Sequence, residues 1–361
     1  MFAKFLSFFS YDLGIDLGTA NTLVWVREKG IVIREPSVVA IHKKTKKLIA
    51  LGGEAKKMLG KTPETIITIR PLRGGVISDF DATSSMIKTF IRDIHRVGKI
   101  LPLTLSRPKV VIGIPSSVTE VERRAVWEAA LSAGAREAYL IEEPMAAAIG
   151  EGLSIFQPTG KMVVDIGGGT SEIAVISLGG IVVSKSLKIA GDEMDQAIMH
   201  YIRLRHGVLL GEPTVEDIKI KIGSAYEGKT KNKGAKDQTV KGEKMMIVRG
   251  RDIETGLPKS LKVTEIEIRE ALAPVIAKII DAISDTLEEA PPELTSDILE
   301  GGILLTGGAS QLAGFDQLIA ERTHIPVVMA EDPMTSVVRG AGKVLLNDRL
   351  LDRVKVIGGL K

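Results

Sequence analysis

The chain has 361 residues, yet it contains no cysteine, few aromatic residues and no long apolar run. Without cysteine there is no disulfide framework, no thiolate zinc site and no cysteine nucleophile, and such a composition fits the reducing cytoplasm. No run approaches the roughly 18 to 20 apolar residues that cross a bilayer, so a transmembrane helix is not expected. Neither charge dominates, because 48 Lys and Arg face 45 Asp and Glu. The whole chain therefore lacks the electrostatic signature of a nucleic-acid-binding protein, and no nucleic acid partner is expected.

What is present is an ordinary globular composition, with 44% hydrophobic and 26% charged residues. It suffices for a sizeable core, and the length predicts two domains or one elaborated pair. Strand patterns such as KVVIGIP and KMVVDIG alternate with helical patterns at residues 84–97 and 267–290, which indicates an α/β chain. Pro291 and Pro292 are expected to end the long second helix.

The basic residues are concentrated in one segment. Residues 227–251 contain eight lysines and arginines against three acidic residues, so the rest of the chain is slightly acidic. Glycine and lysine there predict a solvated loop or hairpin. A second interpretation, in which a basic insertion at residues 229–249 contacts acidic lipid or a protein partner, stays open.

The first ten residues, MFAKFLSFFS, contain four of the eight phenylalanines. One face of a helix is predicted from the i, i+3, i+4, i+7 spacing of Phe2, Phe5, Leu6 and Phe9. That helix either lies among lipid headgroups or docks on the protein's own core. Stable membrane binding needs a second contact. Residues 99–107, in which leucines alternate with polar residues or proline, are a candidate for it, with a buried strand edge as the alternative.

A loose internal duplication is the most informative pattern. Residues 15–22, IDLGTANT, recur as residues 164–171, VDIGGGTS, and an apolar run follows each copy. Both copies predict a buried strand that ends in an aspartate, a sharp turn of small residues, and a returning strand. Two similar lobes are therefore expected. Such turns expose backbone N–H groups to phosphate, and Asp16 and Asp165 facing one cleft suit hydrated Mg²⁺.

Two further glycine motifs each allow two interpretations. Residues 223–230, GSAYEGKT, satisfy the Walker A pattern, but the polar stretch after them predicts no helix to bind phosphate, and the preceding IKIKI is a poor buried strand. A nucleotide site at Lys229 is therefore the weaker interpretation. Residues 304–310, LLTGGAS, follow an apolar strand and precede a helical pattern. They either let a nucleotide approach the backbone or cap that helix.

Together these motifs resemble a known family. DLGTANT, IEEPMAAAIGEGL, VVDIGGGTSEIAV and LLTGGAS are similar to the phosphate-1, connecting, phosphate-2 and adenosine motifs of actin-like ATPases. With EPSVVA and RPLRGGVISDF, they resemble the MreB family of bacterial actins over residues 12–346. The resemblance implies an α/β actin-like fold, in which two related RNase H-like lobes surround a nucleotide cleft and each carries a smaller subdomain.

The resemblance also implies domain boundaries. Residues 1–10 would be an amphipathic membrane-binding helix. The first lobe would comprise a large domain of residues 11–36, 75–156 and 332–361 and a small one of residues 37–74. The second lobe would comprise a large domain of residues 157–191 and 262–331 and a small one of residues 192–261.

Site roles follow from the resemblance, residue by residue. Asp16 and Asp165 would hold Mg²⁺ largely through water, while Glu143 and Thr170 would align the attacking water. The implied phosphate contacts are Gly18, Thr19, Ala20, Asn21, Gly167, Gly168 and Gly169. The remaining ATP contacts, around the adenosine, would be Glu216, Asp217, Ile218, Lys219, Gly307, Gly308, Ala309 and Ser310.

A protein similar to this family binds ATP with Mg²⁺, hydrolyses it slowly and polymerises into double, antiparallel protofilaments. The filaments would lie on the inner face of the cytoplasmic membrane, with membrane proteins of the cell-wall elongation machinery as partners, and would organise peptidoglycan synthesis and rod shape. The alternative is a monomeric Hsp70-like or sugar-kinase-like ATPase, which predicts no assembly and no use for an amphipathic terminus.

Overall fold

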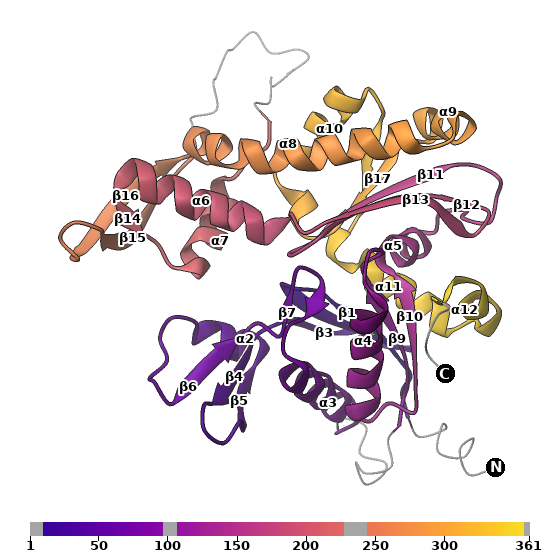
Figure 1. Ribbon diagram of the computed structural model, residues 1–361, viewed down its shortest axis with the longest axis horizontal. Coiled ribbons are helices and arrows are strands. Elements are labelled where there is room, and N and C mark those ends of the chain that lie inside the picture. Colours follow the sequence, from indigo (N-terminus) through magenta and orange to yellow (C-terminus); the bar gives the residue numbers. More distant parts are fainter. Residues whose placement is uncertain (1–9, 97–106, 227–243, 357–361) are drawn as a thin grey trace.

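The structure is a computed structural model of the chain and describes residues 10–96, 107–226 and 244–356. Two five-stranded sheets lie in separate halves of the molecule, which we call the first and second lobes (Figure 1). The first-lobe sheet has the order β10-β9-β1-β2-β3, with bounds Glu137–Glu142, Lys109–Ile114, Leu13–Leu17, Asn21–Val26 and Gly30–Pro36. The second-lobe sheet has the order β13-β12-β11-β17-β18, with bounds Gly180–Leu187, Ser171–Ser177, Lys161–Ile166, Ile303–Thr306 and Val327–Met329.

The two sheets share one pairing scheme. In the first, β1 pairs antiparallel with β2 and parallel with β9. In the second, β11 pairs antiparallel with β12 and parallel with β17. Each hairpin continues into a third antiparallel strand, β3 or β13. The duplication expected from residues 15–22 and 164–171 is therefore confirmed as two strands at equivalent places in two sheets.

Helices cover both faces of each sheet. The first lobe contains α3, α4, α5, α11 and α12, with bounds Phe80–Arg96, Glu120–Ser132, Glu143–Glu151, Ser336–Leu345 and Asp348–Val354. The second lobe contains α6, α7, α8, α9 and α10, with bounds Gly191–His206, Glu212–Ile222, Glu265–Glu289, Pro292–Gly301 and Phe315–Thr323. The short helices are α2, η2 and η3, with bounds Gly52–Lys57, Ala309–Gln311 and Pro333–Thr335.

Local sequence explains the helix ends. Thr119 and Thr264 begin α4 and α8 with capping boxes, in which the threonine side chain and a glutamate three residues later satisfy free N–H groups. Pro291 and Pro292 end α8 and open α9, as expected. Within the described residues, no helix is both long enough and apolar enough to cross a membrane.

Strand alternation divides the interior of the first lobe. Val110 and Ile112 of β9 pack in a core with α3 and α4, whereas Val111 packs in another core that contains α5 and α11. This second core also contains Val163 and Ala174 of the second-lobe sheet. Helices α5 and α11 therefore join the two lobes, and they lie between them in Figure 1.

Glycine permits the close crossing of α5 and α11. A Cβ added at Gly340 would lie 1.8 Å from the carbonyl oxygen of Ala146, and one added at Gly150 would lie 2.0 Å from that of Ser336. Side chains at either position would push the helices apart. The run of small residues after Glu143 thus has a packing role at the junction of the lobes.

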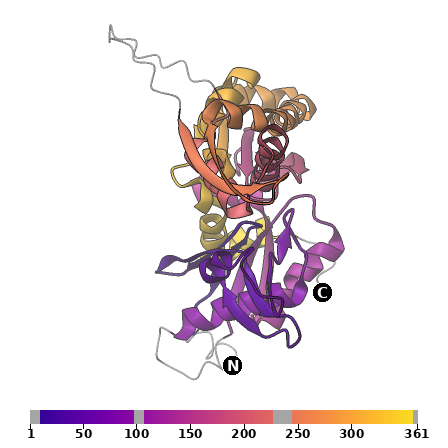
Figure 2. The same cartoon turned by 90° about the vertical axis from the view of Figure 1, so that its left-hand side faces the viewer.

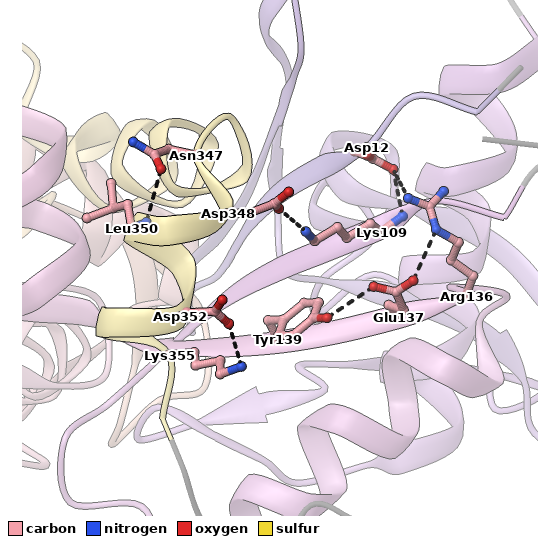
Figure 3. Close-up of polar contacts among 10 residues, drawn as sticks. All are labelled: Asp12, Lys109, Arg136, Glu137, Tyr139, Asn347, Asp348, Leu350, Asp352 and Lys355. Carbon is pink, nitrogen blue, oxygen red and sulfur yellow. Dashed lines mark hydrogen bonds and ion pairs between the residues drawn. The ribbon is translucent and has the colours of Figure 1, made fainter. Parts of the chain in front are cut away.

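Helix α12 docks on the edge of the first-lobe sheet (Figure 3). Its Asp348 forms an ion pair of 2.8 Å with Lys109 of β9, and the N–H of Val356 donates to the carbonyl of Leu140 in edge strand β10. On the same sheet Asp12 accepts from the N–H of Lys109 and pairs with Arg136. The chain therefore enters β1 at a firmly held position.

Three smaller sheets complete the fold. One lies beside the first lobe, with order β5-β4-β6 and bounds Leu48–Leu51, Val39–His42 and Ile66–Ile69. Another lies beside the second lobe, with order β14-β15-β16 and bounds Val208–Leu209, Met245–Asp252 and Pro258–Thr264. The third is the pair β7-β8, with bounds Leu72–Arg73 and Val76–Ile77. Both three-stranded sheets lie on one side of the molecule (Figures 1 and 2). The domain boundaries derived from the resemblance stay a prediction.

The structure places two segments that the sequence singled out. Residues 245–251 of the basic segment lie in strand β15, which pairs antiparallel with β16, so this part forms a hairpin, one of the two structures predicted for it. The IKIKI segment lies in helix α7, in which Val215, Ile218 and Ile222 are buried at helical spacing. A helix and not a strand therefore leads directly into Gly223, so residues 223–230 lack the preceding strand that a Walker motif requires. The N-terminal helix and nearly all of the leucine-containing loop lie outside the described residues.

Candidate functional site

A cavity of about 500 Å³ lies between the lobes and is lined by both duplicated turns. Most residues that the sequence singled out contribute to its wall. They are Asp16, Gly18, Thr19, Ala20, Asn21, Glu143, Asp165, Gly167, Gly168, Gly169, Thr170, Glu216, Lys219, Gly307, Gly308 and Ala309. Segments separated by up to 293 positions in the chain, from Asp16 to Ala309, therefore meet in one site.

The two turns contact each other across the lobes. A Cβ added at Gly168 would lie 2.5 Å from the Cβ of Ala20, and one added at Gly169 would lie 2.4 Å from the hydroxyl oxygen of Thr19. Only glycine allows this approach. In the described part of the chain, the N–H groups of Gly168 and Gly169 have no acceptor, so they are available to an anion in the cavity.

The N-terminus of α6 supports the second turn. The N–H of Asp192 donates to the carbonyl of Gly168 at 2.7 Å, and the N–H of Gly191 donates to that of Gly167 at 3.2 Å. Both α6 residues line the cavity. A helix of 16 residues thus directs its positive end toward the region where the turn exposes its amides.

The paired aspartates have no basic side chain to stabilise their ionised forms. Burial raises the pKa of Asp16 to about 7. Burial also raises the pKa of Asp165 to about 8, with the carboxylates of Asp16 and Glu172 adding to the shift. No basic side chain among the described residues lowers either pKa. A cation bound from solution would therefore favour the ionised form of the pair.

A divalent cation with retained water fits this pair. Carboxylate oxygens are the ligands that Mg²⁺ prefers, and Mg²⁺ commonly keeps several waters and takes only one or two protein carboxylates. In residues 10–96, 107–226 and 244–356 no group of three or more Asp, Glu or His side chains is arranged to hold a metal directly. Asp16 and Asp165 with water and a ligand's phosphates would make up such a shell.

Glu143 and Thr170 lie on the cavity wall from opposite lobes. Glu143 opens α5 directly after strand β10 and is 9% exposed, and Thr170 precedes β12 and is 7% exposed. Burial raises the pKa of Glu143 well above its usual range, and the charges of Glu172, Asp16 and Asp165 raise it further. A carboxyl group and a hydroxyl group therefore face one small polar space beside the two turns.

Helix α7 forms another part of the wall. Glu216 and Lys219 line the cavity, and so do Ile220 and Lys221 at the end of the helix. Asp217 is not among the lining residues and pairs with Lys221 at 2.6 Å, while Ile218 is fully buried in the second-lobe core. Of the four consecutive residues expected at the adenosine, Glu216 and Lys219 therefore line the cavity, whereas Asp217 and Ile218 do not.

The third glycine turn, at residues 307–310, also lies only partly on the cavity wall. Gly307, Gly308 and Ala309 line the cavity, whereas Ser310 does not. The hydroxyl of Ser310 is fully buried and donates to the carbonyl of Gly307 at 2.6 Å. Ser310 therefore supports the turn and is not among the residues that line the cavity.

Several wall residues carry no recognisable sequence signal. Lys56 pairs with Glu216 at 2.6 Å, and Arg70 pairs with Glu212 at 3.2 Å, so basic groups beside the first lobe meet acidic groups of α7 across the cavity mouth. Lys219 pairs with Asp195 at 2.9 Å. These partners come from distant segments of the chain, so no local pattern in the sequence connects them.

Comparison with known proteins places this site in a family. The sequence model of the MreB/Mbl protein family matches residues 10–353. The chain belongs to the MreB/Mbl family. It is 50% identical to the cell shape-determining protein MreB of Escherichia coli strain K12 over 96% of each chain. It is 46% identical to the cell shape-determining protein Mbl of Bacillus subtilis strain 168, covering 96% of this chain and 99% of that one.

Solved structures of the MreB/Mbl kind share the fold. The crystal structure of MreB5 of Spiroplasma citri bound to AMPPNP superposes with a TM-score of 0.84 at 37% identity, covering 93% of this chain and 96% of that one. The same protein bound to ADP gives a TM-score of 0.85 at 36% identity, covering 96% and 98%. The two-lobed actin-like fold expected from the motifs is thereby confirmed.

Proposed function

We propose that this MreB/Mbl family member is a cell-shape-determining, actin-like ATPase that polymerises on the inner face of the cytoplasmic membrane. One observation carries the proposal: two glycine turns, each following an aspartate at the end of a strand, meet at a single cavity with Glu143 and Thr170 beside them. The relatives support it, because two are named cell shape-determining proteins and MreB5 was solved with AMPPNP and with ADP.

Phosphate binding is assigned to the turns. The free N–H groups of Gly168 and Gly169 and the N-terminus of α6 supply donors and positive potential. Mg²⁺ held through water by Asp16 and Asp165 would neutralise charge on the phosphates. Glu216, Lys219 and the turn at Gly307 and Gly308 would contact the nucleoside.

Glu143 and Thr170 are assigned the attacking water. Phosphoryl transfer demands alignment of the nucleophile more than a strong base, so a carboxyl and a hydroxyl group that hold one water are sufficient. Their origin in different lobes makes the alignment depend on closure of the cavity. Hydrolysis is therefore expected to be slow and sensitive to assembly.

Nucleotide that contacts both lobes would favour the closed state by population shift. Closure brings the pairs Lys56–Glu216 and Arg70–Glu212 together at the cavity mouth, which links the bound nucleotide to the relative position of the small sheets. In the proposal, that closed form assembles into double protofilaments of identical subunits.

Membrane attachment is assigned to the N-terminal helix with Phe2, Phe5, Leu6 and Phe9 on its apolar face. Filaments that array many such helices would convert weak single contacts into stable binding. The residues that follow this segment are held to the first lobe: the N–H of Tyr11 donates to His95, and the carboxylate of Asp12 accepts from the N–H of Lys109. Proteins of the cell-wall elongation machinery would then be recruited at the membrane, which would direct peptidoglycan synthesis.

Co-pelleting with anionic liposomes tests the proposal. The full chain is incubated with liposomes with and without Mg-ATP, and the pellet is imaged by negative-stain electron microscopy. Filaments on liposomes are expected with Mg-ATP. The variant Phe2→Asp/Phe9→Asp should leave filaments in solution with unchanged ATP hydrolysis. Soluble monomer that binds ATP would instead favour the Hsp70-like or sugar-kinase-like alternative.

A further inference from the structure

Glu172 is a buried carboxylate that the proposed chemistry does not use. It lies in strand β12 opposite Asp165 and is 1% exposed. The duplicated hairpin of the first lobe provides an internal comparison, because Leu23 occupies the matching place opposite Asp16. An apolar residue therefore satisfies this hairpin fold. The hairpin fold alone therefore does not explain why the second copy has an acidic residue, Glu172, at this place.

The hydrogen bonds of Glu172 join the two lobes. One carboxylate oxygen accepts from the backbone N–H of Ser116 at 3.0 Å, and the other accepts from the hydroxyl of Ser186 at 2.5 Å. Ser186 lies in β13 of the second lobe, next to β12. Ser116 lies in the loop that follows β9 of the first lobe. Glu172 is thus held by its own lobe and holds a loop of the other.

A turn of the first lobe at Gly75 contacts both that loop and Thr170. A Cβ added at Gly75 would lie 2.6 Å from Pro115 Cγ and 2.8 Å from Thr170 Cγ2, so the Gly75 turn is packed between these two side chains. The same turn is fixed by its N–H, which donates to the Thr19 hydroxyl at 3.0 Å. The position of Pro115 therefore determines how closely Thr170 can approach the first lobe.

The other end of the segment contacts Glu143. A Cβ added at Gly113, the residue of β9 that pairs with Ile141, would lie 3.5 Å from Glu143 Cγ. Four residues, 113–116, thus extend from the side chain of Glu143 to the amide that Glu172 binds. Glu172 itself is two residues beyond Thr170 on the same chain. One hydrogen bond consequently ties together the two halves of the site assigned to the attacking water.

We propose that Glu172 is a positioning residue for ATP hydrolysis, whose carboxylate bridges the lobes and sets the distance between Glu143 and Thr170. The inference rests on the proposed ATPase function. Displacement of an aligning group by about 1 Å can lower a rate 100-fold. The turns and helix α7, which bind nucleotide, do not depend on this bridge. Loss of the bridge should lower kcat and leave the KM for Mg-ATP within about threefold, because KM approximates the dissociation constant when chemistry is slow.

Two substitutions separate position from charge. In Glu172→Gln the amide oxygen still accepts from Ser116 and the amide nitrogen donates to Ser186, so the bridge is kept without the charge. In Glu172→Ala both bonds are lost. We expect kcat to fall roughly 10- to 100-fold in the alanine variant and to stay within about threefold of wild type in the glutamine variant.

The experiment measures steady-state phosphate release and binding of a fluorescent ATP analogue by the full chain, with assembly followed in parallel by pelleting. Ser186→Ala, which removes only the second-lobe support, is expected to lower kcat about two- to tenfold and serves if Glu172→Ala does not fold. Asp297→Ala is the matched control. It removes a carboxylate that accepts from the Gly160 N–H at 2.7 Å within one lobe, and it should keep wild-type kcat.

The outcomes separate this inference from the proposed function. Wild-type protein that binds no ATP or does not hydrolyse it would refute the proposed function, and the positioning role with it. Active wild type with kcat unchanged in Glu172→Ala would overturn the positioning role alone. Equal losses in the glutamine and alanine variants would also overturn it, since charge and not the bridge would then matter. If the Glu172→Ala protein does not fold, a wild-type kcat in Ser186→Ala would overturn the positioning role.

Discussion

Replacement of Gly168 by alanine tests whether the two turns meet when nucleotide is bound. The added Cβ would lie 2.5 Å from the Cβ of Ala20 and 3.0 Å from its backbone nitrogen. The backbone of Gly168 is outside the left-handed region, so alanine adds no local strain. The clash lies between lobes, and a small opening of the cavity relieves it. We therefore expect the cost to appear in nucleotide binding more than in folding.

The magnitude follows from the packing. Overpacking by one methyl group in a close contact costs about 1 to 3 kcal/mol. If the closed, nucleotide-bound state bears this cost alone, affinity for Mg-ATP falls roughly 5- to 150-fold. Replacing Ala20 by glycine in the same protein removes the 2.5 Å contact and leaves only the backbone atoms at 3.0 and 3.3 Å. The double variant should thus recover part of the affinity.

Titration with a fluorescent ATP analogue, together with thermal unfolding with and without Mg-ATP, measures both effects. Gly180→Ala is the matched control in the same lobe, because the nearest atom to its added Cβ is 3.9 Å away. It should bind as wild type does. A Gly168→Ala protein that binds within twofold of wild type would refute the inferred contact, and so would a double variant with no recovery.

Three further predictions concern the charged groups. The pKa of Asp165 is about 8 in the fold against an ordinary 3.8, so the folded state binds more protons between these values and metal-free stability falls as pH rises from 5 to 8. Thermal scans should show a smaller fall in Asp165→Asn, and an equal fall would contradict the assignment. Lys229→Ala should leave nucleotide binding unchanged, whereas Asp165→Ala should abolish Mg-dependent hydrolysis. The reverse pattern would instead support a P-loop at residues 223–230. Lys56→Glu should weaken ATP binding about fivefold, corresponding to about 1 kcal/mol, and Glu216→Lys in the same protein should restore part of it if the 2.6 Å pair closes the cavity.

The duplicated turn is a part of the structure that a local sequence pattern can predict. Each copy joins apolar residues, an aspartate and small turn residues within eight positions, so strand, turn and returning strand could be predicted without knowledge of distant contacts. The family resemblance added the partner motifs. The structure places both turns on one cavity wall with Glu143 and Thr170, as the resemblance implied.

Helix α7 shows where a contiguous motif misleads. A family motif names consecutive residues, whereas a helix presents every third or fourth residue to one side. Glu216 and Lys219 consequently face the cavity, and Ile218 is buried at 0% exposure in the core. Knowledge of the segment as a helix would have been enough to separate these positions. The segment EDIKIKIGSAY already has a helical pattern in the sequence, so the helical period could have been applied to the motif.

The sequence by itself determined the class of the molecule: two related lobes, an acid at the end of a strand in each, and glycine where the backbone turns. These features depend on neighbours within a few residues, and so a short stretch of sequence is enough to predict them. Only the tertiary structure decided which residues meet across the lobes. The Glu172–Ser116 bridge, the Lys56–Glu216 pair and the contact of Gly168 with Ala20 each join segments 56 to 160 positions apart. No local pattern encodes such a pairing, because it arises from the packing of the two lobes against α5 and α11.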